Sequence, residues 1–321
     1  MKLILSRLIM LFASLVLCTA AMAQAYPNKT VKIVIPYPAG SGWDRVVRVI
    51  SERLQQKHGQ PFVVENRSGA GGNIGAEHVF RSAPDGYTML ATAPSPLVIN
   101  QTLYSKLPYE PDQFEPVSVM VSLPNVLVVT NRLPVENVKD LLAYANANPG
   151  KLNYSSQGMG TTPHLTGEMF KAMSGVKMVH VIYKGVTPAL TDLIGGQVDL
   201  MFADMASAMP HIKAGKLKAL AVASPQRNAL LPNIPTMSET IPGFVSVLWY
   251  GMAAPPKTPS DITNKLSASI AEEMKAPAVV SMLGGLGMDV VANSPAEMQA
   301  FMNNEKQRWG KVIRDANIRI D

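Results

Sequence analysis

The chain has 321 residues, of which 29 are Lys or Arg and 23 are Asp or Glu, so its formal net charge at neutral pH is +6. The basic residues are dispersed and no aromatic residues alternate with them, which excludes an obvious nucleic-acid-binding surface. A chain of this length buries more than one ordinary domain core, so two lobes are expected.

The N-terminal segment has the pattern of a secretory signal peptide. Lys2 and Arg7 precede an apolar run, and small residues follow up to Ala23. We therefore predict a signal peptide over residues 1–23, with cleavage after Ala23. The run is too short for a membrane-spanning helix, and a lipoprotein site at Cys18 is disfavoured because a leucine precedes it.

The exported chain is predicted to lack cysteine, because Cys18 is the only one in the sequence. This excludes disulfides, thiolate nucleophiles and thiolate metal ligands. Without the signal the chain has 27 basic and 23 acidic residues, a net charge of +4 that favours anions mildly. An exported protein without disulfides suits a Gram-negative periplasm, with a secreted product as the alternative.

The first candidate site is a glycine loop between a predicted strand and a predicted helix. Residues 31–35 are mostly β-branched, prolines end the run, and apolar residues recur at helical spacing from Arg45 onward. The free amides and the dipole at a helix N-terminus favour anions. We take the residues of this loop as candidate ligand contacts: Tyr37, Ala39, Gly40, Ser41, Gly42, Trp43 and Asp44.

Two of these residues have alternative roles. Asp44 stands where a helix-capping carboxylate would stand, so it either accepts amide hydrogen bonds or contacts the ligand. Trp43 is either a plug in the core or a wall of the binding site, where it would stack on a flat ligand.

Strands and helices then alternate, which predicts a parallel, doubly wound sheet. Strands are expected at 61–65 and 87–92, with a helix at 76–81 between them. The glycine-rich turn before this helix misses the dinucleotide spacing, because Ile74 stands where the third glycine belongs. We therefore expect a structural turn and no cofactor. Ser95 follows the third strand, where open α/β folds collect ligands, although a serine also serves in turns.

A second alternating set follows two predicted strands at 117–120 and 125–130. It contains a second glycine loop before a helix, with Pro163 at the first helical position. The candidate contacts here are Ser155, Gly158, Thr161, Thr162 and His164. A histidine in a first helical turn is also often a packing residue, so His164 keeps both roles.

The remaining predicted elements complete this set and lead to the C-terminus. Helices are expected at 138–147, 186–194, 206–214 and 261–274, and strands at 152–155, 178–183, 198–203, 217–223 and 244–253. The capping box from Ser294 to Glu297 starts a last helix, which we expect to cover the first lobe.

Five long motifs in order carry a resemblance to a known family. They are IPYPAGSGWDRVVR, VVENRSGAGGNIGAEHVFRSAPDGYTML, NYSSQGMGTTPHLTGEMF, VIYKGVTPALTDLIGGQVDLMFADMASAMPHIKAGKLKALAVAS and SPAEMQAFMNNEKQRWGKVI. The chain resembles the periplasmic substrate-binding proteins of tripartite tricarboxylate transporters, the Bug receptor family. This implies an α/β periplasmic binding protein fold of two doubly wound lobes joined by two crossing strands, with a ligand cleft between them. We place lobe 1 at 24–127 and 248–321 and lobe 2 at 128–247.

The resemblance also implies a function. The expected ligand is a small carboxylate, either a dicarboxylate, a tricarboxylate or an aromatic carboxylate. One carboxylate would be gripped by the loop from Tyr37 to Asp44, and the second lobe would contribute Ser155 to His164 and the segment at Asp204. Closure of the lobes would deliver the ligand to the membrane permease subunits of the transporter. We expect a monomer without metal or cofactor.

Trp43 departs from the family pattern, and if it faces the cleft it favours a planar ligand. An enzyme is the rival class, but Gly-x-Ser-x-Gly, His-Glu-x-x-His and metal-spaced histidines are absent from the sequence. A ligand-presenting partner of a membrane sensor is the other alternative.

Overall fold

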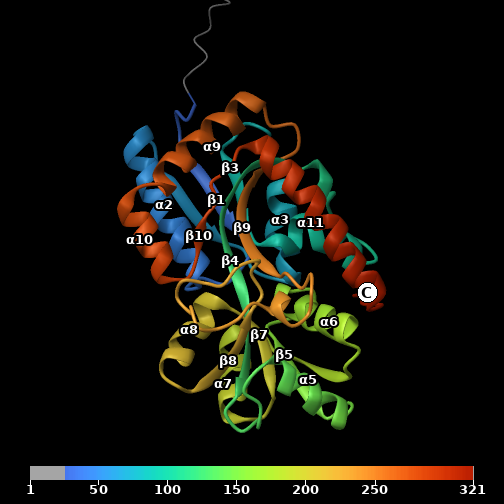
Figure 1. Ribbon diagram of the computed structural model, residues 1–321. Coiled ribbons are helices and arrows are strands. Elements are labelled where there is room, and N and C mark those ends of the chain that lie inside the picture. Colours follow the sequence, from blue (N-terminus) through green and yellow to red (C-terminus); the bar gives the residue numbers. More distant parts are fainter. Residues whose placement is uncertain (1–25, 321) are drawn as a thin grey trace, which may run out of the picture.

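The computed structural model describes residues 26–320, which form two α/β lobes stacked one above the other (Figure 1). The predicted signal peptide and its cleavage site lie outside the described residues. Within the described part of the chain, no helix combines the length and apolarity needed to cross a bilayer.

Lobe 1, the upper lobe in Figure 1, begins with the predicted strand, loop and helix. β1 (Val31–Ile35) pairs in parallel with β2 (Phe62–Asn66) on one side and with β3 (Thr88–Thr92) on the other. α2 (Gly42–His58) and α3 (Asn73–Phe80) pack on opposite faces of these strands, each into its own apolar core (Figure 1). Both glycine loops of this lobe therefore follow the carboxyl ends of parallel strands.

One long strand belongs to both lobes. β4 (Glu115–Thr130) pairs antiparallel with β9 (Val247–Ala254) up to Pro124, and from Asn125 onward it pairs with strands of lobe 2. The second crossing lies between Ser246, whose amide bonds to a lobe 2 carbonyl, and β9. These positions lie close to the predicted lobe bounds near 127 and 247. The bounds themselves stay a prediction.

Lobe 2 repeats the alternation of strands and helices. β5 lies between β6 and β7 and is parallel to both, while β7 and β8 run antiparallel to β4. Its elements are α5 (Val138–Ala147), β5 (Leu152–Ser156), α6 (Thr162–Ser174), β6 (Met178–Ile182), α7 (Val186–Gly195), β7 (Leu200–Asp204), α8 (Met205–Lys213) and β8 (Leu217–Val222).

The sheet is mixed, whereas strand and helix alternation alone predicted a parallel one. The parallel pairs are those inside each lobe, and the antiparallel pairs all involve the crossing strands β4 and β9. Crossing strands must run in opposite directions because the chain enters lobe 2 through one and returns through the other. The two strands predicted at 117–120 and 125–130 are likewise one continuous strand.

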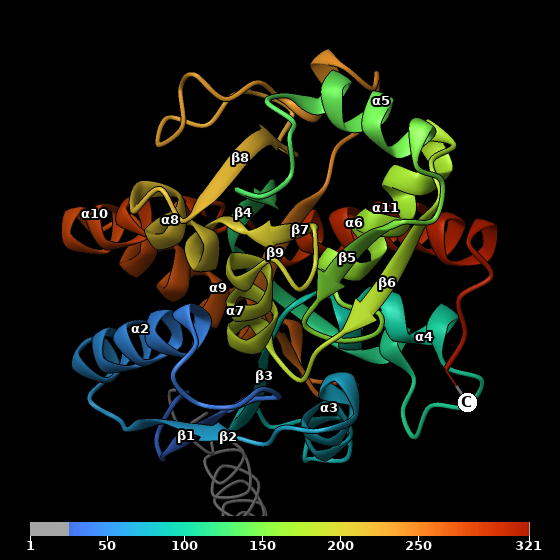
Figure 2. The same cartoon turned by 90° about the horizontal axis from the view of Figure 1, so that it is seen from below.

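The C-terminal helices cover the outside of lobe 1 and reach lobe 2. They are α9 (Ser260–Met274), α10 (Pro277–Gly285), which the sequence pattern did not predict, and α11 (Pro295–Asp315). The capping box is present, because Ser294 accepts the Glu297 amide and Glu297 accepts the Ser294 amide. α11 packs on lobe 1 as expected and also lies beside α6 of lobe 2 (Figure 2).

Candidate functional site

The first glycine loop is closed around the carboxylate of Asp44. Ser41 is the N-cap of α2, and its hydroxyl accepts the amide of Asp44 (3.1 Å). The Asp44 carboxylate accepts hydrogen bonds from the Gly40 amide (3.1 Å), from Arg48 (3.0 and 3.1 Å) and from Asn66 (3.0 Å). Every one of these bonds lies inside lobe 1, so Asp44 holds the loop in shape.

The protonation of Asp44 follows from these bonds. Burial by itself would raise the pKa of its carboxyl, but hydrogen bonds from Arg48, Asn66 and the Gly40 amide outweigh burial and hold the pKa below its usual value. Asp44 is therefore an ionised carboxylate engaged within lobe 1. The exposed residues of the loop are Pro38, Ala39, Gly40 and Ser41.

Of its two predicted roles, core residue or wall of the binding site, Trp43 has the core position. Its side chain is 1% exposed, and its indole N–H donates to the Ala91 carbonyl (3.3 Å). The ring stacks on Tyr250 with 4.6 Å between ring centroids and 10° between planes. The condition for the planar-ligand prediction, a Trp43 ring facing the cleft, is not met in this structure, because the indole packs among the lobe 1 core residues.

Tyr250 is the residue of this region that sequence reasoning missed. It lies on the crossing strand β9, half-buried, above Trp43. Burial raises the pKa of its phenol well above the ordinary value, and the neighbouring Asp204 of lobe 2 and Tyr37 of lobe 1 raise it further. Tyr250 thus sits between the two predicted half-sites. In the sequence, nothing distinguishes Tyr250 from the other residues of the predicted strand at 244–253.

Tyr37 is tied to lobe 1. Its hydroxyl shares a 3.2 Å hydrogen bond with Thr92 at the end of β3, and burial raises its pKa to about 12. Tyr37 is therefore a neutral phenol that can only donate or accept hydrogen bonds at neutral pH.

The second glycine loop leaves the N-terminus of α6 without a side-chain cap. Thr161 is the N-cap residue, but its hydroxyl donates back to the Gly158 carbonyl (2.7 Å) rather than accepting from the helix amides. Thr162 and Pro163 open the helix, and both are buried. An uncapped helix N-terminus is where an anion is best stabilised.

His164 is buried and stabilises this loop by a hydrogen bond. Its Nδ1 accepts the Gly160 amide (3.1 Å), and its ring stacks on His180 with 4.1 Å between centroids. Burial lowers the pKa of His164 to about 3 and that of His180 to about 4. His180 in turn stacks on Tyr154, and its Nε2 lies 2.7 Å from the Ser156 hydroxyl. His164 is thus a neutral packing residue whose acceptor is occupied.

The two lobes touch at the second loop. The Ser95 hydroxyl of lobe 1 donates to the Gly160 carbonyl of lobe 2 (3.3 Å). Gly160 has φ +69°, and a Cβ built on it would lie 2.0 Å from Leu103 of lobe 1. Only a glycine therefore permits this close approach of the lobes.

Two candidates remain, Asp204 and Ser155. Asp204 caps a helix, whereas the hydroxyl of Ser155 makes no hydrogen bond among the described residues. Asp204 is the N-cap of α8 and accepts the Ser207 amide (2.9 Å), while burial raises the pKa of its carboxyl. Ser155 is completely buried in β5, and its hydroxyl has no hydrogen-bond partner among the described residues. An unpartnered buried hydroxyl is uncommon and identifies a position where a ligand or a water would be stabilised.

The structure therefore places the predicted residues in a lobe 1 loop, a lobe 2 loop and Ser95, which follows β3 and bonds to Gly160 of the lobe 2 loop. Tyr250 and Asp204 lie near one another between the lobes. The structure also assigns structural tasks to Asp44, Trp43 and His164. Within the described residues, no three His, Cys, Asp or Glu side chains come together as a metal site would require.

Comparison with known proteins identifies the family. Residues 46–318 match the model of the "Tripartite tricarboxylate transporter family receptor". Protein BugT of Bordetella pertussis is 35% identical over 301 residues, which cover 93% of this chain and 92% of BugT.

Two solved structures share the fold along nearly all of the chain. Rpa4515 of R. palustris, solved with adipate, is 36% identical with a TM-score of 0.85, covering 92% of this chain and all of that one. MatC from Rhodopseudomonas palustris, solved with bound malate, is 31% identical with a TM-score of 0.81, covering 90% of this chain and all of that one. The matched family is one of receptors, so this chain is a solute-binding receptor and not an enzyme. The chain belongs to the tripartite tricarboxylate transporter receptor family, whose members include the Bug proteins.

Proposed function

We propose that this periplasmic solute-binding receptor captures a small aliphatic dicarboxylate between its lobes and delivers it to the membrane permease of a tripartite tricarboxylate transporter. The observation that carries the proposal is the uncapped N-terminus of α6, next to the Ser95–Gly160 contact between the lobes. One carboxylate would be held there, and the other by the exposed residues from Ala39 to Ser41 at the start of α2.

The ligand class is supported from two sides. Adipate and malate, which the two structural relatives hold, are both aliphatic dicarboxylates. The buried indole of Trp43 offers no stacking surface to an aromatic acid. Asp204 fits an anionic ligand only when its carboxyl is neutral, and the burial that raises its pKa favours the neutral form.

Binding and release follow from the uncharged donors that would hold the ligand. Amides, hydroxyls and the phenol of Tyr250 would replace the hydration of the ligand without a full-charge ion pair. The ligand stabilises the closed form by its greater affinity for it, and release to a permease requires only that these hydrogen bonds exchange with water.

A binding screen tests the ligand class. We expect adipate and malate to raise the melting temperature of the exported protein, because a ligand that binds only the native state stabilises it. Citrate, benzoate and terephthalate should shift it less. Tyr250→Phe should weaken the binding about tenfold, equivalent to one hydrogen bond, and Tyr144→Phe on α5 is the matched control. No shift with any carboxylate contradicts the proposal.

An uptake experiment tests the delivery step. Deletion of the gene should abolish uptake of the radiolabelled dicarboxylate, and the wild-type gene should restore it where the Tyr250→Phe gene does so poorly. Normal uptake in the deletion strain, with loss of a transcriptional or chemotactic response to the ligand, would instead favour the sensor-partner role.

A further inference from the structure

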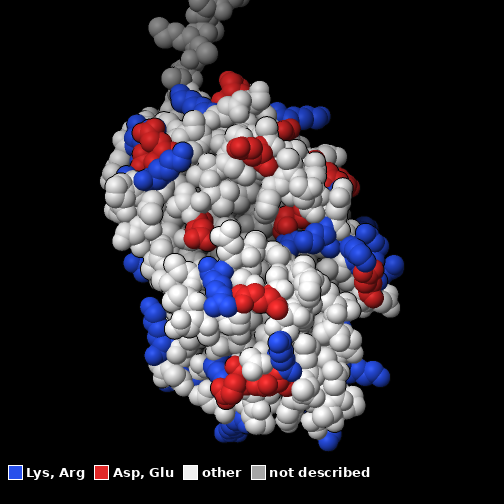
Figure 3. Space-filling view, viewed as in Figure 1, with Lys and Arg blue, Asp and Glu red and all other residues white. Residues whose placement is uncertain are grey.

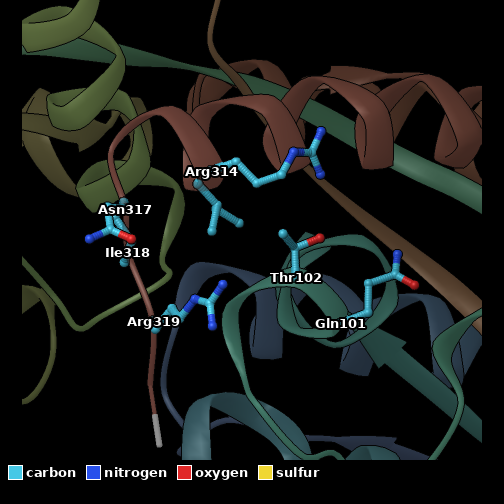
Figure 4. Close-up of a pocket in the computed structure, with 7 residues that line it drawn as sticks. Gln101, Thr102, Arg314, Asn317, Ile318 and Arg319 are labelled. Atoms are coloured by element: carbon cyan, nitrogen blue, oxygen red, sulfur yellow. The ribbon is translucent and has the colours of Figure 1, made fainter.

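A cavity that opens to solvent lies away from the candidate ligand contacts. It has a volume of about 470 Å³ and lies between α4 (Asn100–Leu103) and the C-terminal end of α11 (Figure 4). None of the candidate ligand contacts lines it, so it belongs to a different part of lobe 1.

The wall of this cavity is fixed by backbone hydrogen bonds. After α11 the chain turns at Asn317, which has φ +50°, and the Ile318 amide bonds to the Ile313 carbonyl (3.0 Å). Ile320 then pairs with the segment after α4, since its amide donates to the Leu103 carbonyl (2.9 Å). The C-terminal segment is therefore held against the helix that forms the opposite wall.

Two guanidinium groups in the cavity have no acidic partner among the residues that the structure describes. Arg314 and Arg319 both line it, both are exposed, and neither makes an ion pair with any residue from 26 to 320. The other basic residues of α11 are all paired, namely Lys306 with Asp112, Arg308 with Glu305 and Lys311 with Asp315. Basic side chains gather at the right edge of Figure 3, where Figure 1 shows the end of α11.

Neutral donors stand beside these charges. A Cβ built on Gly310 would lie 3.1 Å from Nη1 of Arg314 and 3.6 Å from the hydroxyl of Thr102, so these two groups lie near each other between α11 and α4. Figure 4 shows Thr102 and the amide side chain of Gln101 on the wall opposite Arg314. Ile313 and Ile318 supply an apolar surface between the polar groups.

The helix dipole opposes an anion at this end of α11, but it is the weaker effect. A helix C-terminus carries about half a negative charge. Here the amides of Ala316, Asn317 and Ile318 already bond to carbonyls of the last turn. The two full positive charges of Arg314 and Arg319 exceed the partial negative charge that remains at the helix C-terminus.

We propose that this cavity is a binding site for a phosphate group, either as free phosphate or as the phosphodiester headgroup of an anionic lipid. Guanidinium groups, a hydroxyl and amides that line one cavity suit a tetrahedral oxyanion with several acceptor oxygens. The volume exceeds that of bare phosphate, and the two isoleucines offer space for the organic part of an ester. The site is independent of the carboxylate receptor function.

Calorimetric titration of the exported protein with inorganic phosphate in a chloride buffer tests the site. We expect binding that weakens at least tenfold in the double variant Arg314→Gln/Arg319→Gln. The matched control is Lys177→Gln/Lys216→Gln, which removes the same charge from exposed positions of lobe 2 and should bind like the wild type. Equal melting temperatures of the variants would show that they are folded.

Vesicles distinguish the two sources of phosphate. Sedimentation with phosphatidylglycerol vesicles that depends on the two arginines, and is absent with phosphatidylcholine, supports the lipid headgroup. Arginine-dependent binding of inorganic phosphate alone supports the free anion. Binding of neither probe, or equal weakening in both double variants, overturns the proposal.

Discussion

The amide of Gly160 donates to Nδ1 of His164, which leaves the imidazole no choice of tautomer. Nδ1 accepts and therefore carries no proton, and burial keeps the ring neutral by lowering its pKa to about 3. The single proton is on Nε2. The loop that approaches lobe 1 is thus supported by a neutral histidine with a defined donor.

His164→Ala should destabilise the protein by about 2 kcal/mol, because the Gly160 amide loses its acceptor and His180 loses its stacking partner. His164→Asn should recover part of this loss, since its side-chain oxygen can replace Nδ1. Urea denaturation measures both variants, and His211→Ala on α8 is the control. If His164→Ala and His211→Ala lower the stability equally, His164 does not stabilise the Gly160 loop.

The buried histidines predict a loss of stability in mild acid. His164 and His180 have folded pKa values of about 3 and 4, against 6.5 when unfolded, so the unfolded chain binds more protons below pH 6.5. Stability should therefore be full above pH 6.5 and fall as the pH drops toward 4, by up to about 1.4 kcal/mol per pH unit for each histidine. Urea midpoints from pH 7.5 to 4.5 measure this. His164→Asn should flatten the curve, and a wild-type curve that is flat over this range contradicts the prediction.

Gly160→Ala should hinder the approach of the lobes. Its methyl group would meet Leu103, and the positive φ adds strain of about 1 kcal/mol. We expect weaker dicarboxylate binding and a larger radius of gyration with ligand present, measured by small-angle scattering. Adding Leu103→Ala should restore much of the affinity by removing the clash. No rescue by the second substitution would show that backbone strain, rather than the contact, is responsible.

The Ser155 hydroxyl should matter only when ligand is bound. Since it has no partner among the described residues, Ser155→Ala should leave the stability of the ligand-free protein unchanged or slightly raised. Dicarboxylate affinity should fall about tenfold, which corresponds to the loss of one hydrogen bond to a carboxylate. Ser51→Ala is the control, because the Ser51 hydroxyl is equally buried but bonds to the Val47 carbonyl. Lost stability with unchanged affinity would contradict the ligand role.

Trp43→Phe should test whether the indole selects ligands. Because the ring is buried against Tyr250, we expect a loss of stability of about 1–3 kcal/mol and no change in the ranking of aliphatic over aromatic acids. Thermal-shift ranking of adipate, malate and terephthalate measures it. A changed ranking would show that the indole reaches the ligand after all.

Local patterns in the sequence predicted most elements but few of the contacts between them. The bounds predicted for α5 are those observed, and β1 likewise, because a periodic apolar face and a clear stop signal specify a segment on their own. The stacking of His164 on His180 joins residues from a helix and a strand, and no local pattern encodes such a pair. Periodicity identifies the buried face of a helix or strand, but it does not identify the element on which that face packs.

The same reasoning explains the two opposite outcomes for the aromatic residues of the site. Trp43 was a candidate for ligand contact because it stands in a loop of small residues, yet its side chain packs in the core. Tyr250 was indistinguishable from any strand residue, yet its phenol lies between the lobes. The difference depends on how β9 crosses above α2, which is a property of the whole fold.

The position of β9 also governs how the protein can reach its native state. β9 separates β3 from β4 in the sheet, although it follows β4 in the sequence by more than a hundred residues. As the chain emerges from the export channel, the edge of β3 has no neighbour until almost all of lobe 2 has appeared. An unpaired edge recruits other strands. We therefore expect nascent chains to depend on periplasmic chaperones during this interval, and truncations before residue 247 to aggregate rather than to yield a separate first lobe.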